Sequence, residues 1–409
     1  MRLLITSNGI WLSGAQISVN EFVKLLKNRV EIRVLTCFRG KYSASLRDVQ
    51  VHKLSCKNIG VLLDMHLDNK AEKFIEWADV VWIATGEFTI ASKVKRVKRI
   101  PVIASLHSYE LLCPSMWLSY AINEVCNDNC SPLKIIGCRL RACLNMVKSN
   151  VASPLRGLIR TSLNTLITPL YFYYWKKLMK TSIDSIDSFI AVSKALQNIY
   201  SNYLPEFQNK SSIVIYNPVI EPLRYVKPDP SEPYEDYILY ASGSNPVKGP
   251  HVLLEAWSTV SKELRGLKLY MIGCKNSWVE KYAKRMGLNN VVFLYKLPPS
   301  NLYNMMYKAR AVVMPSIWPE AFGRIPVEAN RLGVPAVVSN RGALPEIIED
   351  GVTGFVTRID SYELANVIVD VVSSDWERSK IIENVSRRIN PINGINTLLK
   401  FFEKVAYEA

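Results

Sequence analysis

The sequence predicts an α/β protein built from two doubly wound domains, and three observations support this fold class. The chain has 409 residues, which is longer than a chain that folds around a single hydrophobic core. Of these residues 49% are hydrophobic, which is enough for two cores. Strand-like and helix-like runs alternate from the start of the chain, a pattern typical of parallel sheets. The alternation stops at a proline-rich stretch, residues 217–233, and then resumes.

The individual elements follow from short apolar runs separated by amphipathic stretches. In the first half we expect a helix at residues 16–27 and strands at residues 2–6, 31–36, 80–84 and 101–106. In the second half we expect strands at residues 237–241, 268–272, 291–294 and 311–314.

These runs divide the chain into four parts. We expect a first Rossmann-like domain at residues 1–216 and a proline-rich linker at 217–234. A second Rossmann-like domain follows at 235–388, and a last helix occupies 389–409. The first domain contains a cysteine-rich, basic and amphipathic insertion at about residues 113–180.

The window at residues 315–330 joins two carboxylates, a Phe-Gly turn and a helix start. Pro326 suits the first turn of a helix and Gly333 is a stop signal, so we expect a helix from about residue 325 to 332. Its first backbone amides have no intrahelical partner, and with the helix dipole they offer a site for phosphate oxygens.

Two glutamates flank this helix start. Glu320 is expected in the preceding loop and Glu328 in the first helical turn. Carboxylates accept hydrogen bonds, which suits them to sugar and ribose hydroxyls around a bound diphosphate. The alternative is that Glu328 is only a favourable first-turn residue and Glu320 a solvated loop charge.

The spacing of these glutamates, with Phe-Gly after the first, resembles the donor-site motif of retaining glycosyltransferases of family 4. The likeness continues on both sides of the window, at residues 289–294, 303–315, 333–339, 342–348 and 350–356. It implies the GT-B fold, in which two Rossmann-like domains face across a cleft and the last helix crosses back to the first domain. The resemblance also implies that Glu328 holds the ribose and Glu320 the donor sugar, with further donor contacts from Pro315, Ala321, Phe322, Gly323, Arg324 and Ile325.

The loop after the strand at residues 237–241 contains Ser244 and Lys248. It resembles the family loop in which an arginine and a lysine neutralise the donor diphosphate, and Lys248 matches the lysine. The arginine is absent, because Gly243 or a neighbouring serine stands in its place. Arg324 is the expected source of a compensating charge, and the alternative for Lys248 is a solvated loop lysine.

The first domain offers two further candidate contacts. Gly14, Ala15 and Gln16 follow the first strand at a helix start, where a glycine lets backbone approach a ligand. His107 ends the strand at residues 101–106, and ligands bind at the carboxyl ends of parallel strands. The resemblance implies that His107 lies beside the transferred sugar, so His107, Glu320 and Lys248 are the expected catalytic residues. Ordinary packing is the alternative for the histidine.

Five of the eight cysteines cluster in the insertion. Their spacing allows a structural zinc or iron–sulfur site, and disulfides or buried thiols stay open as alternatives. The clustered residues are Cys113, Cys126, Cys130, Cys138 and Cys143. The resemblance implies that catalysis itself needs no metal ion.

The net charge of +15 is concentrated in the first domain and its insertion. Residues 1–180 hold 26 of the 51 Lys and Arg but only 12 of the 36 Asp and Glu. Residues 155–180 mix basic with aromatic and aliphatic side chains, a composition that favours an anionic membrane surface. No apolar run reaches the roughly 18 residues expected of a membrane span, and a helix packed in its own domain is the alternative.

Together these features predict a retaining hexosyltransferase that moves a sugar from a UDP- or GDP-sugar to a hydroxyl acceptor. We expect a lipid-linked glycan or a polysaccharide precursor as acceptor, at the cytoplasmic face of the inner membrane. The alternatives are a sugar-nucleotide epimerase or phosphorylase of related fold, a nucleic-acid-binding protein, and an inactive homologue. No nucleic-acid recognition motif was found in the sequence, so no nucleic-acid partner is expected.

Overall fold

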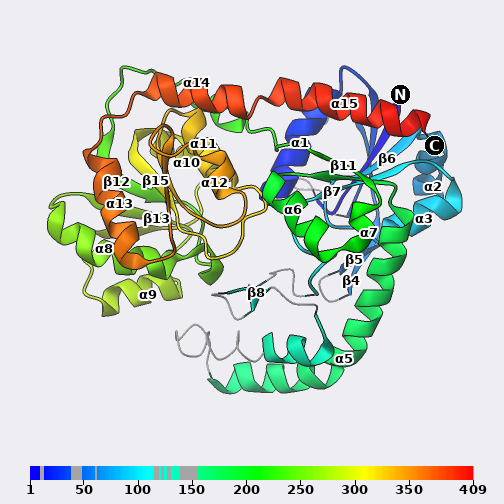
Figure 1. The fold of residues 1–409 in the computed structure, drawn as a ribbon, viewed down its shortest axis with the longest axis horizontal. Helices are drawn as coiled ribbons and strands as arrows, with labels where there is room; N and C mark the ends of the chain where they lie inside the picture. Colours follow the sequence, from blue (N-terminus) through cyan, green and yellow to red (C-terminus); the bar gives the residue numbers. More distant parts are fainter. Residues whose placement is uncertain are drawn as a thin grey trace.

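The computed structural model describes residues 1–9, 13–37, 48–59, 62–114, 119–120, 124–126, 130–138 and 154–408. Two lobes lie side by side, and each contains a parallel sheet flanked by helices (Figure 1). The expected fold class, two doubly wound α/β domains, is therefore confirmed.

The first sheet has seven strands in the order β11-β10-β7-β6-β1-β2-β3, and all its pairs are parallel. Their bounds are β1 Arg2–Ser7, β2 Glu31–Thr36, β3 Gln50–Lys53, β6 Val80–Ile83, β7 Val102–Leu106, β10 Ser188–Ala191 and β11 Ser211–Val214. Successive side chains of β1 alternate between two cores: Leu4 packs in one and Leu3 and Ile5 in the other. Both faces of the sheet are therefore buried at its centre, which explains why central strands such as β6 and β7 are nearly continuous apolar runs.

The helices of the first domain connect these strands. They are α1 Gly14–Leu26, α2 Asn69–Trp77, α3 Ile90–Val97, α5 Pro154–Ser185, α6 Lys194–Tyr203 and α7 Pro205–Gln208. The expected helix at residues 16–27 is α1, which begins two residues earlier and ends one residue earlier. Ser13 is its N-cap, and the Ser13 backbone amide donates to the Gln16 side chain at 3.0 Å.

The second sheet has six strands in the order β14-β13-β12-β15-β16-β17, again all parallel. They are β12 Glu235–Tyr240, β13 Lys268–Ile272, β14 Val291–Leu294, β15 Ala309–Met314, β16 Ala336–Ser339 and β17 Gly354–Thr357. The helices are α8 Pro250–Glu263, α9 Trp278–Arg285, α10 Pro299–Lys308, α11 Arg324–Arg331, α12 Leu344–Ile347, α13 Ser361–Ser373 and α14 Arg378–Arg388. The 3-10 helix η2 Glu221–Arg224 lies in the connection between the sheets. A second one, η3 Pro246–Lys248, follows β12.

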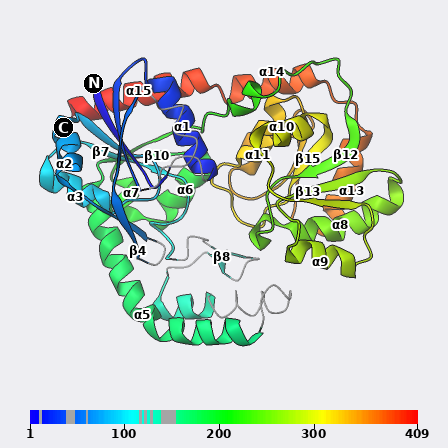
Figure 2. The same cartoon turned by 180° about the vertical axis from the view of Figure 1, so that it is seen from behind.

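The last helix, α15 Pro391–Tyr407, lies over the first domain rather than the second (Figure 2). Ile395, Leu398 and Phe402 are fully buried in one core of the first sheet. The Phe402 and Trp82 rings lie 5.5 Å apart between centroids. The chain therefore crosses between the domains twice.

The insertion of the first domain projects below its sheet (Figure 1). It contains the two-residue strands β8 Ser119–Tyr120 and β9 Glu124–Val125, a helical turn at 132–138, and the long helix α5. A separate hairpin, β4 Ser55–Ile59 and β5 Leu62–His66, follows β3. Among the described helices, none has the length and apolarity that a membrane crossing requires.

Candidate functional site

The loop after β15 is tied to the loop after β12, so two of the expected donor-binding segments form one unit. The backbone amides of Ile317 and Trp318 donate to the carbonyl of Val247, at 2.8 and 3.1 Å. Gly249 has a φ of +70°, and a Cβ there would lie 1.9 Å from the carbonyl oxygen of Pro315. Only glycine fits this approach, and the contact holds Lys248 beside the loop that carries Glu320.

Lys248 and Glu320 form an ion pair with an Nζ to Oε1 distance of 2.6 Å. The Ser316 hydroxyl donates to the same carboxylate oxygen at 2.6 Å, and the lysine ammonium lies 4.9 Å from the Trp318 ring centroid. The Glu320 side chain is only 6% exposed, and that of Lys248 is 23% exposed. The structure thus brings two of the three expected catalytic residues into direct contact and makes Ser316 part of the site.

Helix α11 begins at Arg324, with Gly323 as its N-cap. Gly323 has a φ of +93°, and a Cβ there would lie 2.6 Å from the side chain of Leu344, so the turn requires glycine. The expected amides at residues 323–325 therefore lie at a helix N-terminus. The expectation that Glu328 occupies the first turn was wrong, because it is the fifth residue of α11 and lies one turn further along.

Arg324 does not project as expected. Arg324 was expected to face the loop after β12, where the family arginine is missing. Instead, Arg324 turns into the first domain, where its Nη1 donates to Glu21 Oε2 at 2.8 Å. Its Nε donates to Glu328 Oε1 at 3.1 Å. All three side chains are nearly inaccessible to solvent, so the charge of Arg324 is already balanced by two carboxylates.

His107 lies directly after β7, partly buried, with a hydrogen bond to the backbone of Ala84. Burial lowers the pKa of His107 to about 4, so the imidazole is neutral at pH 7. Two residues further on, the Tyr109 hydroxyl donates to the carbonyl of Pro319 at 2.7 Å, and its ring meets the Trp318 ring edge-on. The histidine loop of the first domain therefore packs directly on the Glu320 loop of the second.

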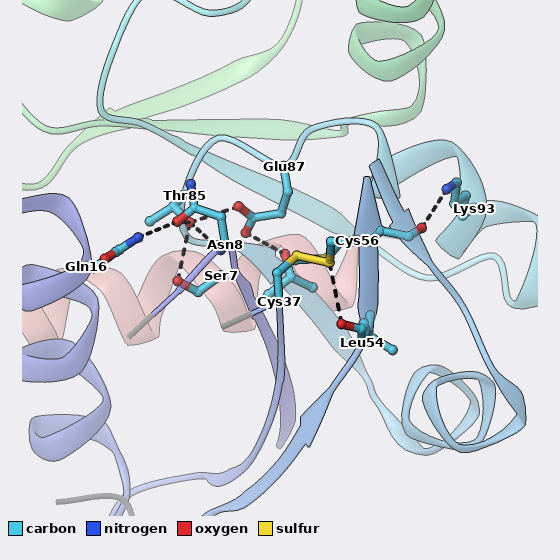
Figure 3. Close-up of a disulfide and its surroundings, with 11 residues drawn as sticks. Ser7, Asn8, Gln16, Cys37, Leu54, Cys56, Thr85, Glu87 and Lys93 are labelled. Atoms are coloured by element: carbon cyan, nitrogen blue, oxygen red, sulfur yellow. Dashed lines mark hydrogen bonds between the residues drawn. A yellow bond between two sulfur atoms is a disulfide. The ribbon is translucent and has the colours of Figure 1, made fainter. Parts of the chain in front are cut away.

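The first turn of α1, with Gly14, Ala15 and Gln16, also approaches the second domain. A Cβ at Gly14 would lie 3.3 Å from Cδ of Arg324, so the start of α1 faces the start of α11. The Gln16 amide donates to Asn8 Oδ1 at 2.8 Å (Figure 3).

Two buried carboxyl groups lie near the carboxyl ends of β1 and β6. Glu87 is fully buried and accepts from Thr85 Oγ1 at 2.8 Å and from Thr6 Oγ1 at 3.3 Å (Figure 3). Burial raises the pKa of Glu87 to about 8, with the charge of Glu110 adding to the shift. Burial likewise raises the pKa of Glu110 to about 7. Neither group was expected from the sequence, since a single glutamate in a loop carries no distinctive pattern.

A third contact between the domains uses a helix N-terminus. The Glu346 carboxylate accepts from the amides of Lys194 and Ala195 at the start of α6, at 3.0 and 2.9 Å, and from the Tyr216 hydroxyl at 2.9 Å. Beside it, the Ser193 hydroxyl donates to the carbonyl of Ala321 at 2.6 Å. This acid on the dipole of α6 is a favourable electrostatic arrangement.

The remaining expected donor residues lie either between the two domains or within the second domain. Phe322 is 4% exposed and its ring packs 6.2 Å from that of Tyr216 between the domains. The Ser244 carbonyl accepts from Trp278 Nε1 at 2.7 Å. Pro315 lies in the tight contact with Gly249, and Ile325 is partly buried against the cores of both domains.

The described cysteines of the cluster agree with one of the three alternatives, that of thiols, and a disulfide that was not expected lies outside the cluster. Cys37, at the end of β2, forms a disulfide with Cys56 in β4, close to Glu87 (Figure 3). Cys113, Cys126, Cys130 and Cys138 are thiols, and burial together with the neighbouring thiols raises the pKa of Cys130 to about 12. Within the described ranges, no three His, Cys, Asp or Glu side chains are arranged as metal ligands. Cys143 lies outside those ranges.

Known proteins resemble this chain in sequence over part of its length. Residues 226–405 match the family model described as glycosyl transferases group 1. Spore coat protein SA of Bacillus subtilis is 29% identical over 157 residues, which cover 35% of this chain and 41% of that protein. A D-inositol 3-phosphate glycosyltransferase of Segniliparus rotundus is 30% identical over 138 residues, covering 32% and 30%. The matched regions thus span less than half the length of either relative.

The fold extends over the whole chain. The crystal structure of the Anabaena protein HepE in complex with UDP and glucose superimposes with a TM-score of 0.69 at 19% identity, covering 99% of this chain and 100% of that one. At this identity the likeness concerns the fold, which is GT-B. Residues 226–405 therefore resemble the glycosyl transferases group 1 family, within a chain that has the GT-B fold along its length.

Proposed function

We propose that the protein is a retaining glycosyltransferase that transfers a hexose from a UDP- or GDP-sugar to a hydroxyl group of a glycan or lipid-linked glycan. The observation that carries this proposal is the buried group of Lys248, Glu320 and Ser316 next to the N-terminus of α11, against the His107 loop. The neighbouring HepE structures contain UDP or UDP-glucose, which supports a nucleotide-sugar donor.

The chemistry requires stabilisation of the leaving nucleotide. The bond between the anomeric carbon and the diphosphate oxygen breaks, and its electron pair stays on the phosphate. Lys248 and the backbone amides at the start of α11 are placed to stabilise this charge, which is the main demand on the site. These donors take the role that a divalent ion would otherwise have, so we propose that catalysis is independent of metal.

The acceptor hydroxyl forms the new bond on the face that the nucleotide leaves, and its proton passes to the departing phosphate. Glu320 orients the donor sugar, and one oxygen of Glu328 accepts from the ribose. His107 is neutral at pH 7 and serves as a hydrogen-bonding partner for the sugar rather than as a cation.

The donor is identified by incubating the protein with individual UDP- and GDP-sugars and measuring hydrolysis, first without and then with membrane lipid extract. We expect one donor to turn over faster with extract, and EDTA to leave the rate unchanged. The anomeric configuration of the product, read by NMR, tests retention. Release of an epimerised nucleotide sugar without acceptor would point to an epimerase instead.

Two variants test the site itself. Glu320→Gln and Glu328→Ala are each expected to lower kcat/KM by about 100-fold or more, as the loss of a polar contact in the transition state does. Glu280→Gln is the control, because Glu280 is also a buried carboxylate, 8% exposed, but belongs to α9. Unchanged turnover in both site variants would refute the proposed function.

Helix α5 favours a membrane-bound acceptor. Leu170 and Tyr173 on its surface are 74% and 64% exposed. Tyr173 lines a shallow groove of about 300 Å³ together with Lys176, Lys177 and Lys180. Exposed apolar and basic side chains on one helix suit the interface of an anionic bilayer, so we propose that the protein rests on the cytoplasmic face of the inner membrane.

Sedimentation with vesicles tests this surface. Replacing Lys176, Lys177 and Lys180 with Gln is expected to weaken binding to phosphatidylglycerol vesicles by about 5-fold for each lysine at low salt. A matched triple variant of Lys262, Lys281 and Lys284, on the second domain, should bind as the unaltered protein does. Tighter, salt-sensitive binding to RNA or DNA than to the vesicles would contradict the proposal.

A further inference from the structure

A single buried carboxylate, that of Glu21 on α1, joins three separate parts of the molecule. Its Oε2 accepts from Arg324 of the second domain at 2.8 Å. Its Oε1 accepts from the backbone amides of Ile220 and Glu221, in the segment that links the domains, at 3.0 and 2.7 Å. Glu21 is 1% exposed, so water does not replace these bonds.

Arg324 extends the same connection to the proposed ribose site. Besides Glu21, its Nη1 donates to Ser18 Oγ at 2.8 Å and to the carbonyl of Pro218 at 3.1 Å. Its Nε holds Glu328 Oε1, which fixes the carboxylate of Glu328 and leaves Oε2 for another donor. The contact with Glu328 lies within α11, but Arg324 itself is fixed by contacts that exist only while α1, the linker and α11 are together.

The charges of this cluster make the contacts interdependent. Burial tends to lower the pKa of Arg324, but the carboxylates of Glu21 and Glu328 raise it above its usual value. Burial raises the pKa of Glu328, with Glu21 and Glu221 adding to the shift and Arg324 opposing it. Removing one partner would leave a buried charge uncompensated, which is far more costly than losing a surface ion pair.

We propose that Glu21 and Arg324 are positioning residues that couple the closed arrangement of the two domains to the grip of Glu328 on the donor nucleotide. This inference rests on the proposed function, because it assigns the ribose to Glu328. When the domains separate, Arg324 loses Glu21, Ser18 and Pro218, and Glu328 loses its fixed orientation. By linkage, a nucleotide that binds to the oriented Glu328 must in turn favour the closed arrangement.

The test uses the full chain and two probes, UDP and GDP, titrated separately by calorimetry. Glu21→Gln is expected to weaken binding of whichever nucleotide the unaltered protein prefers by about 10- to 100-fold, the usual size of an energetic coupling between two sites. With saturating donor, kcat should change by less than about 3-fold, so that the loss lies in KM. Small-angle scattering should show that the nucleotide compacts the unaltered protein but not Glu21→Gln.

Ser18→Ala provides a gentler variant, because it removes one neutral contact of Arg324 and no charge. It should weaken nucleotide binding by about 5-fold, the value of one hydrogen bond. Glu280→Gln again serves as the control. If removing any buried carboxylate weakened nucleotide binding by lowering stability, this variant would also bind the nucleotide more weakly.

The outcomes separate this inference from the proposed function. If nucleotide binding is lost in Glu328→Ala but unchanged in Glu21→Gln and Ser18→Ala, the proposed coupling is overturned. The proposed transferase function would not be affected by this result. A Glu21→Gln protein whose kcat falls while its KM stays constant would also overturn it. Failure of the unaltered protein to bind or turn over any nucleotide sugar would refute both.

Discussion

At the scale of single residues, the pairing of Lys248 with Glu320 predicts that the two act as a unit. Their side chains meet at 2.6 Å, so removing either breaks the ion pair. We expect Lys248→Ala and Glu320→Gln each to lower kcat/KM by about 100-fold. The double variant should be little worse than either single variant, since residues that act together are not additive. Lys275→Ala, an exposed lysine in the loop after β13, is the control, and multiplicative losses would show two independent roles.

Glu87 predicts how stability depends on pH. Its pKa in the folded protein is about 8, whereas in the unfolded chain a glutamate titrates near its ordinary value of about 4.5. Between these values the folded state holds a proton that the unfolded state has lost, so stability falls as pH rises. The slope from this residue is about 1.4 kcal/mol for each pH unit.

Glu87→Gln removes that titration while keeping the shape of the side chain. We expect the free energy of unfolding, measured in urea at pH 6 and at pH 8, to decline less in this variant than in the unaltered protein. An equal decline would mean that Glu87 is ionised throughout this range.

At the scale of elements, the N-terminus of α6 is predicted to depend on a residue of the other domain. The amides of Lys194 and Ala195 donate to Glu346, whose charge also complements the helix dipole. Glu346→Ala should speed hydrogen exchange of these two amides by about 10-fold or more, because bonds to charged groups are the stronger class. Asp360→Ala removes a comparable cap from α13 and should leave α6 unchanged. Slow exchange at α6 in Glu346→Ala would show that the first domain caps the helix by itself.

At the scale of the whole molecule, the sequence predicts the strands and helices that depend on neighbouring residues, but not the contacts between residues far apart in the chain. Strands such as β7 can be predicted because both of their faces are buried and every residue is apolar or small. Helix α11 can be predicted from Pro326 and Gly333. The orientation of Arg324 was not predictable, because its partner Glu21 lies 303 residues away and is set by how the domains meet. The Cys37–Cys56 disulfide likewise depends on β2 and β4 lying together.

The crossing of α15 predicts that the end of the chain stabilises its beginning. Phe402 is fully buried beside Trp82 in a core of the first sheet, almost the whole length of the chain from β1. Phe402→Ala should lower the free energy of unfolding of the first domain by about 3–5 kcal/mol, the usual cost of emptying an aromatic site.

Hydrogen exchange then distinguishes the two domains. We expect faster exchange in β1 and β6, which contact this core, and unchanged exchange in β12 and β15, which have cores of their own. Tyr407→Ala is the control, because Tyr407 ends the same helix at 93% exposure. Equal loss of protection in both sheets would mean that the domains unfold as one cooperative unit. The contacts of Glu21, Glu346 and Tyr109 across the interface would then dominate the stability of the closed molecule.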